Sequence, residues 1–234
     1  MEYLIVFFLM IISNVILKQI LGVKIKKIKQ LVKQKEQGLE AIEEKLPENQ
    51  KICRNILKKL NLKEVVIEEN ENSDTSLYIA LSNKILLGKI QNRYMAVQTI
   101  AHECIHAKQS KKLQISNFIL SNLYLLYFIV ILFLTLFQII HTSFLQISIL
   151  FLLYLLWYLV RSYLETDAMT KAPYLAKEYL QENQILQPEE LEKLMQEYER
   201  VNRMGIPFIH FQLFFNGSLK IMIYCIVYFV FAIL

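Results

Sequence analysis

Apolar residues in this chain gather in four long blocks that are separated by polar segments. The blocks cover Tyr3–Gly22, Phe118–Ile140, Phe144–Val160 and Leu213–Leu234. A helix rises about 1.5 Å per residue, so the second block, which carries no charge, is long enough to cross the roughly 30 Å hydrocarbon core of a bilayer. The first block has neither a basic leader nor a small-residue cleavage site, which favours a retained anchor over a cleaved signal peptide. The pattern predicts about four transmembrane helices, of which the central two form a hairpin.

The start of the last block has two interpretations because of Lys220. If the span begins at Leu213, Lys220 lies well inside it. If the span begins at Leu219, Lys220 is an interfacial anchor, and residues 207–215 form an amphipathic segment that leads into the membrane. A lysine is costly inside lipid, but near a helix end its long side chain reaches the interface, so we favour the later start.

The polar segments between the blocks predict a folded α+β domain rather than linkers. Hydrophobic spacing and turn residues indicate helices over 24–45, 49–60, 92–112 and 187–204, and strands over 64–68, 78–82 and 85–87. We therefore expect a mainly α integral membrane protein with these parts: an anchor (1–22), an α+β domain (23–117), a transmembrane hairpin (118–160), polar helices (161–212) and a last span (213–234).

The distribution of basic residues predicts how the chain lies in the membrane. Of the 26 Lys and Arg residues, 18 lie between Val23 and Asn117 and six between Arg161 and Gly205, whereas the turn at 141–143 has none. By the positive-inside rule, both long polar segments lie in the cytoplasm and both termini lie outside. The basic residues lack the interleaved aromatic side chains of a nucleic-acid surface. The expected partners are the lipid bilayer and a peptide or protein, with no nucleic acid.

Composition excludes several other classes of protein. With 55% hydrophobic residues, five Gly and four Pro, the chain is neither intrinsically disordered nor a collagen-like repeat. Its three cysteines, Cys53, Cys104 and Cys225, are scattered and odd in number. They indicate a reducing compartment or burial in lipid rather than a disulfide framework.

The candidate chemistry lies in the helix predicted over 92–112. Residues 102–106 read His-Glu-Cys-Ile-His, and positions i and i+4 of a helix share a face, so His102 and His106 can bind one metal ion. Neutral imidazole is a favoured ligand of Zn²⁺, which indicates one zinc ion per chain. Glu103 is the predicted general base, taking a proton from the water that zinc activates for attack on a peptide carbonyl. The alternative is that both histidines are ordinary residues of a helix surface.

A catalytic zinc site usually has three protein ligands, and Glu165 is the predicted third. The other two histidines are poorer candidates, because His141 lies on the predicted outer turn and His210 lies near the last span. A helix that continues past Arg161 would carry Glu165 about 6 Å further along its axis, on the cytoplasmic side. Asp167 is a candidate for the outer shell of the site, accepting a hydrogen bond from a ligand imidazole. The alternative for these two carboxylates is a solvated acidic pair.

Two further features of a peptidase have candidates in the sequence. The strand predicted over 78–82 is either an edge strand, to which an extended substrate adds by backbone hydrogen bonds, or the interior of a sheet. A group that stabilises the oxyanion is also expected. Tyr94, Arg161 and His210 are candidates for it, and none is assigned.

These motifs resemble those of one known family. Residues 101–109, Ala-His-Glu-Cys-Ile-His-Ala-Lys-Gln, are similar to the A-H-E-x-G-H-A-x-Q signature of the bacterial neutral zinc metallopeptidases (the YugP-like group, or type 2 zinc peptidases). Ile79-Ala80-Leu81-Ser82 resembles that family's strand ending in Leu-Ser, and Glu165-Thr166-Asp167-Ala168 resembles its E-x-D-A element. The order of anchor, strands, HExxH helix, two spans, E-x-D-A helix and last span also agrees. Ile105 stands where the family usually has glycine, which implies tighter packing beneath the metal.

The resemblance implies a membrane-embedded zinc peptidase with a zincin-like domain, distantly similar to the HtpX and CAAX-protease clan, in which a glutamate is the third ligand. We therefore expect a gluzincin-like metallo-endopeptidase of a bacterial cell membrane, with its active site on the cytoplasmic side. The main alternative is an inactive membrane scaffold with a vestigial motif, and the intact Glu103 argues against it. Metal transport is disfavoured because the second and third blocks carry no charge. No oligomeric state is predicted.

Overall fold

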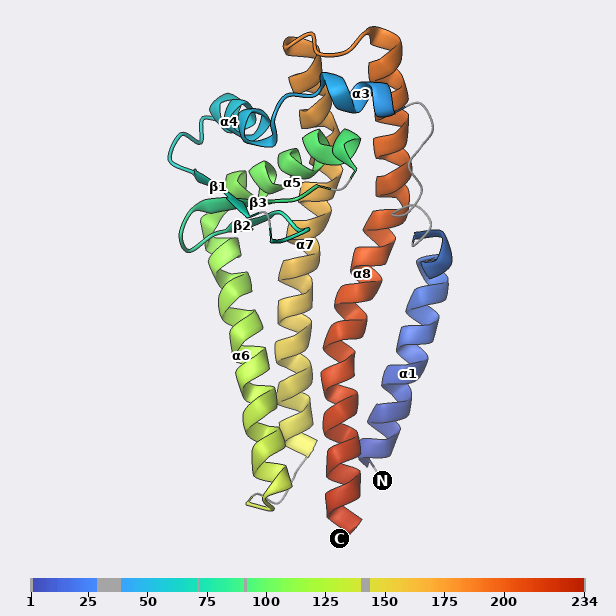
Figure 1. Cartoon of the computed structure of the whole chain (residues 1–234). Helices are drawn as coiled ribbons and strands as arrows, with labels where there is room; N and C mark the ends of the chain where they lie inside the picture. Colours follow the sequence, from blue (N-terminus) through green and yellow to red (C-terminus); the bar gives the residue numbers. More distant parts are fainter. Residues whose placement is uncertain (1, 29–38, 71, 91, 140–143, 234) are drawn as a thin grey trace. The chain divides into compact units, whose positions relative to one another are not determined.

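The computed structural model describes residues 2–28, 39–70, 72–90, 92–139 and 144–233, and it is built mainly from helices (Figure 1). Its three described strands are β1 (Val66–Asn70), β2 (Leu77–Ile79) and β3 (Lys84–Gly88). The helices, in chain order, are α1 (Glu2–Ile20), α3 (Glu40–Lys45), α4 (Asn49–Lys59), the 3₁₀ turn η1 (Arg93–Met95), α5 (Ala96–Lys108), α6 (Lys111–Leu136), α7 (Phe144–Glu182) and α8 (Pro188–Ile233).

Four of the described helices are long and apolar enough to cross a membrane. They are α1, α6, α7 and α8, each of which contains a stretch of high mean hydropathy with few charges. This confirms the prediction of a mainly α protein with about four helices of this kind. α6 starts before the second apolar block and ends at Leu136, ahead of the predicted end of that block. The predicted turn at 141–143 lies outside the described residues.

Two of these helices join an apolar stretch to a polar one without a break. α7 continues from the third apolar block past Arg161 to Glu182, as the prediction for the third ligand requires. α8 begins at Pro188, because the fixed φ of proline suits the first turn of a helix. The polar helix predicted over 187–204 and the last apolar block are parts of this one helix, with Pro207 inside it.

Contacts within the chain divide it into two compact units. The first unit comprises Met1–Val23, Ser116–Tyr163 and Pro207–Leu234. The second unit comprises Lys24–Ile115 and Leu164–Ile206, and it contains every residue predicted to bind the metal.

The first unit is a helical bundle with an aromatic core. Side chains from α1, α6, α7 and α8 are buried together, and Tyr154 and Tyr224 are fully enclosed. Many Leu, Ile and Phe side chains of the same helices are exposed instead, such as Leu126, which has 60% of its surface accessible. Helices with apolar residues on their outer faces are typical of lipid surroundings, because a bundle in water places polar residues there.

Polar groups inside this bundle form hydrogen bonds between helices. The Tyr124 hydroxyl on α6 donates to the carbonyl of Gly217 on α8 at 2.7 Å. The amide of Asn14 on α1 donates to the hydroxyl of Ser218 on α8 at 2.8 Å. Groups buried among apolar side chains have no water as an alternative partner, so these bonds help to determine which helix faces are in contact.

The second unit has its own core, which surrounds α5. The amphipathic helix α4 buries Ile52, Cys53, Ile56 and Leu57, and α5 is buried on nearly every side. α5 therefore lies at the centre of this unit, with α4 and the strands β2 and β3 against it (Figure 1). The polar parts of α7 and α8 complete the core with side chains such as Tyr198, which is fully buried.

The sheet has the order β1-β3-β2, with β1 parallel and β2 antiparallel to β3. β2 is therefore an edge strand, one of the two interpretations of the 78–82 segment. This strand is shorter than predicted, because residues 80–83 form the turn into β3, where Asn83 has a φ of 50° that asparagine tolerates well. Gly88 ends β3. A Cβ at this position would lie 2.6 Å from the Thr75 backbone, so only glycine allows the segment at Thr75 to lie against the end of β3.

The helix that carries the histidines is shorter at both ends than the sequence predicts. α5 begins at Ala96, after η1, and Asn92 makes no side-chain cap at the start of η1. α5 ends at Lys108, because Gln109 has an extended backbone with φ −62° and ψ 161°. A new helix, α6, then begins at Lys111.

Two other predicted elements differ in their bounds. β1 begins two residues later than the predicted 64–68 strand, because residues 63 and 64 still belong to a turn after α4. Of the helix predicted over 24–45, residues 25–28 are helical and α3 covers the end, whereas 29–38 lie outside the described residues.

Gly217 on α8 should tolerate no side chain, because a Cβ there would lie 2.0 Å from the Tyr154 ring. We expect Gly217→Ala to lower the free energy of unfolding in detergent by about 1–3 kcal/mol, the usual cost of overpacking, measured as a fall in melting temperature. Gly205→Ala on the same helix is the control, since its Cβ would meet only the flexible end of Met169 and alanine favours helix. An unchanged melting temperature for Gly217→Ala would contradict this packing.

Candidate metal centre

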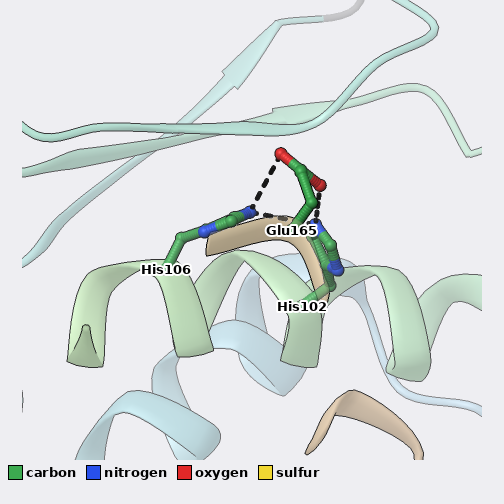
Figure 2. A group of neighbouring side chains, drawn as sticks. All are labelled: His102, His106 and Glu165. Carbon is green, nitrogen blue, oxygen red and sulfur yellow. Dashed lines mark hydrogen bonds and ion pairs between the residues drawn. The ribbon is translucent and has the colours of Figure 1, made fainter. Parts of the chain in front are cut away.

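α5 places the two histidines of the site one turn apart on the same face. His102 and His106 project from this face, and their Nε2 atoms lie 3.0 Å apart, with the ring planes at 88° (Figure 2). The other faces of α5 are held by the core, through residues such as Ile100 and Cys104. The helical spacing predicted for the two histidines is confirmed, and the core packing determines where their face points.

Glu165 comes from α7 and turns its carboxylate toward both rings (Figure 2). Its Oε2 lies 3.5 Å from Nε2 of His102, and its Oε1 lies 3.6 Å from Nε2 of His106. One ligand atom from each of the three residues lies within 4.8 Å of the others. The structure thus brings together the three residues that the sequence predicts as metal ligands.

The donor atoms of the three residues lie close enough together for one metal ion to bind among them. With metal–ligand distances of about 2.0–2.2 Å, two ligand atoms of a tetrahedral zinc lie roughly 3.3–3.6 Å apart. The two Nε2 atoms lie 3.0 Å apart, and each lies 3.5 or 3.6 Å from a different oxygen of Glu165, so each of these pairs is within about 0.3 Å of that range. Two imidazoles and a carboxylate are also donors that zinc accepts, so these residues fit a zinc ion. Three protein ligands leave the fourth position to water or substrate.

Two of the three side chains are shielded from solvent, and the third is partly exposed. The side chains of His106 and Glu165 are 7% and 8% exposed, and that of His102 is 21% exposed. A buried carboxylate is costly unless a cation or hydrogen bonds compensate its charge. A metal ion bound by these donors would compensate this charge.

Glu103 is buried and held by the edge strand. The residue is 7% exposed, and its Oε2 accepts a hydrogen bond of 2.7 Å from the backbone N–H of Tyr78 on β2. Tyr78 lies opposite Ile85 in the antiparallel pair of strands. Along such a strand, the backbone N–H and C=O groups of successive residues point in turn to the partner strand and to the open side. The bond to Glu103 shows that the Tyr78 N–H points to the open side, so Glu103 is docked on the free edge of the sheet.

Asp167 is linked to the site through an amide. Oδ2 of Asp167 accepts a hydrogen bond of 2.9 Å from Gln109. The Oε1 of this glutamine lies 2.9 Å from Nδ1 of His106. Oδ1 of Asp167 pairs with Lys171 Nζ at 2.5 Å. Burial raises the pKa of Asp167, but the bonds from Gln109 and Lys171 outweigh it and bring the pKa below its usual range. The link predicted between Asp167 and a ligand imidazole thus runs through Gln109, a residue without a predicted role.

Gln109 and Gln114 are the residues around the site that the sequence interpretation missed. Gln114 Nε2 donates to Gln109 Oε1 at 2.9 Å. The available signal for Gln109 was its place at the end of the family-like signature. Its contact with α7 could not be read from that place, because it depends on the end of α5 and on the packing of two distant helices.

The other candidates lie elsewhere. Cys104, inside the motif, turns its sulfur into the core, 3.9 Å from the sulfur of Cys53. The contact with Cys53 and burial raise the pKa of the Cys104 thiol, so it stays protonated and inert. Tyr94 is buried in the core of the second unit, whereas Arg161 and His210 belong to the first unit. No oxyanion role is assigned to these three residues.

The fold and the site together define a mainly helical protein with four helices of transmembrane length and a His-His-Glu group able to hold a metal. The chain belongs to the zinc peptidase family described as "Putative neutral zinc metallopeptidase", whose sequence model matches residues 4–199. This match confirms the resemblance and includes the whole candidate site. Searches of curated proteins and of solved structures gave no match.

Removing the charge of Glu165 should deprive the site of metal. Glu165→Gln nearly keeps the shape of the side chain but loses a charged ligand, so zinc per chain should fall about tenfold or more at a fixed, low zinc concentration. Elemental mass spectrometry on detergent-purified protein measures this. Asp167→Asn is the comparison and should lower zinc content less. Full occupancy in Glu165→Gln would show that Glu165 is not the third ligand.

Proposed function

We propose that the protein is a membrane-embedded zinc metallo-endopeptidase, in which Glu103 is the general base for attack of water on a peptide bond. The observation that carries the proposal is the buried triangle of His102, His106 and Glu165 in a chain of the neutral zinc metallopeptidase family. The family supports the class of enzyme. The geometry around the triangle supports the roles given to individual residues.

The three ligands are proposed to hold one zinc ion per chain. Bound there, zinc would lower the pKa of a coordinated water toward about 7 and polarise the carbonyl of the scissile bond. His102 and His106 supply neutral nitrogen donors, and Glu165 supplies a negative charge that balances part of the cation. The low exposure of His106 and Glu165 strengthens the electrostatic interactions inside the site.

Glu103 is the proposed carrier of the proton. The backbone N–H of Tyr78 holds its carboxylate with a charge-assisted hydrogen bond, so the group is positioned before the substrate arrives. Glu103 would take the proton of the attacking water and then deliver it to the leaving amine. A base that is already in place needs little reorganisation during the reaction, which is why its docking on β2 supports this role.

The open edge of β2 is the proposed place for the substrate backbone. β2 is paired with β3 on one side only. On the other side the Tyr78 N–H is bonded to Glu103, so the Tyr78 carbonyl, which points the same way, is the group proposed to accept a hydrogen bond from the substrate backbone. An extended peptide can add to such an edge through backbone hydrogen bonds, which are independent of the side chains of the substrate. Because Glu103 is bonded to this strand, a peptide lying along the edge would pass the proposed base.

We infer that the four apolar helices cross the cell membrane and that the second unit lies in the cytoplasm. The length of these helices and their exposed apolar side chains support the crossing. The basic residues of both polar segments support the orientation. The metal site would then act on cytoplasmic or membrane-associated peptides and proteins.

Glu103→Gln tests the catalytic proposal. The amide has the size of the carboxylate but cannot take a proton, so hydrolysis of a mixture of quenched fluorescent peptides should fall by about 10²–10⁴-fold. Zinc content should stay at the wild-type value, because Glu103 is not a proposed ligand. Glu192→Gln, at an exposed position of α8, is the control and should keep full activity.

Two outcomes of this experiment would contradict the proposal. Turnover retained by Glu103→Gln would show that another group is the base. A wild-type protein that binds zinc but cleaves none of the peptides would favour the inactive scaffold.

The orientation can be tested with introduced cysteines, because the three native cysteines are buried. Gln181→Cys, on the exposed surface of α7 in the second unit, should react with a membrane-impermeant maleimide only after spheroplasts are permeabilised. Glu2→Cys, at the start of α1, should react in intact spheroplasts. The reverse pattern would show the opposite orientation. Labelling of both positions in intact spheroplasts would contradict the crossing.

A further inference from the structure

Gln109, which follows the last residue of α5, contacts both helices that carry the proposed ligands. Its Oε1 lies 2.9 Å from Nδ1 of His106. Its Nε2 lies 2.8 Å from the carbonyl oxygen of Leu164 and 2.9 Å from Oδ2 of Asp167, both on α7. Leu164 directly precedes Glu165, so this one side chain joins a ligand imidazole of α5 to the backbone beside the third ligand.

The partners of Gln109 determine which end of its amide faces the histidine. The Leu164 carbonyl can only accept a hydrogen bond, so the group that faces it is the NH₂ of the amide. The Asp167 carboxylate, paired with Lys171, accepts a second bond from the same NH₂. The amide oxygen then faces His106 at 2.9 Å, and because this oxygen can only accept, Nδ1 of His106 carries the proton. The NH₂ of Gln114 also lies 3.5 Å from this nitrogen, but its nearer acceptor is the Gln109 oxygen at 2.9 Å.

Gln114 supports the same orientation. Its Nε2 donates to the backbone carbonyl of His106 at 3.3 Å, which identifies this end of Gln114 as the NH₂ group. The same NH₂ donates to Oε1 of Gln109 at 2.9 Å. Exchanging the two ends of the Gln109 amide would therefore place like groups against each other at Leu164, Asp167 and Gln114.

We propose that Gln109 is a positioning residue that holds His106 in the Nδ1–H tautomer and so presents the Nε2 lone pair to the metal. This proposal rests on the metal site proposed above. An imidazole binds a metal through its unprotonated nitrogen, and the partner of the other nitrogen decides which one that is. Gln109 also bonds to α7. Its single amide therefore sets both the orientation of the His106 ring and the approach of the helix that carries Glu165.

The first test compares two leucine variants of the full-length protein in detergent. Gln109→Leu removes both ends of the amide at similar size, and zinc affinity from chelator competition should fall about 10–100-fold. Gln98→Leu is the matched control, because Gln98 is a buried glutamine of α5 that donates to Asn202 on α8. Its zinc affinity should change less than about threefold. Equal losses in both variants would overturn the proposal, since general packing would then explain the effect.

The second test observes the tautomer itself in metal-free protein. Ring-nitrogen NMR of ¹⁵N-histidine-labelled protein has only four histidines to resolve, and the spectrum of His106→Gln assigns the signal of His106. The wild type and Gln98→Leu should show a protonated Nδ1, and Gln109→Leu should shift toward the Nε2–H form. An Nε2–H ring in the wild type, or an unchanged spectrum in Gln109→Leu, would overturn the proposal. If the wild type binds no zinc, the proposed function fails, but this spectrum still decides whether Gln109 sets the tautomer.

The third test reverses the bond between Gln109 and Asp167. Gln109→Glu keeps an acceptor for His106 but places a second carboxylate against Asp167, so it should bind zinc more weakly than the wild type. Adding Asp167→Asn removes this repulsion and supplies an NH₂ donor in its place, whereas the bond to the Leu164 carbonyl stays lost in both variants. The double variant should recover zinc affinity to within about tenfold of the wild type. No recovery would overturn the role given to the bond with Asp167.

Discussion

The contact between α5 and α7 is the constraint on which the candidate metal site depends, because each helix carries only part of the proposed ligand set. His102 and His106 come from α5, and Glu165 comes from α7 at 3.5 and 3.6 Å from their rings. Ala168 and Ala172 follow Glu165 at i+3 and i+7 and are fully buried in the core around α5. Their small side chains lie on the same face of α7 as the glutamate, so burial of this face turns Glu165 toward the centre of the second unit.

The same contact gathers three carboxylates, of which Glu103 and Glu165 are buried and Asp167 is half-buried. Glu103 accepts the N–H of Tyr78, and Asp167 accepts from Gln109 and pairs with Lys171. Glu165 faces the two imidazoles, which carry no full charge when neutral. A cation between them would offset the cost of burying this carboxylate, so metal binding at this group would stabilise the second unit.

The two units place polar and apolar side chains in opposite ways. In the first unit, hydrogen bonds such as that from Tyr124 to Gly217 lie inside, and large apolar side chains lie outside. In the second unit, apolar residues surround α5, and ion pairs such as that between Lys59 and Glu182 lie on the surface. α7 and α8 contribute to both units as continuous helices, so the change from one pattern to the other occurs within a single helix.

The sequence by itself determined the features that depend on a single segment of the chain. An apolar block of transmembrane length and the i, i+4 spacing of His102 and His106 are local properties, and both were predictable for that reason. Glu165 was predictable because charge placed its segment on the same side as the motif and a family resemblance supported it. The tertiary structure decided what depends on contacts between distant segments. Gln109 reaches Leu164 because α5 ends at Lys108 and the backbone of Gln109 is extended, and such boundaries follow the balance of tertiary contacts more than local propensity.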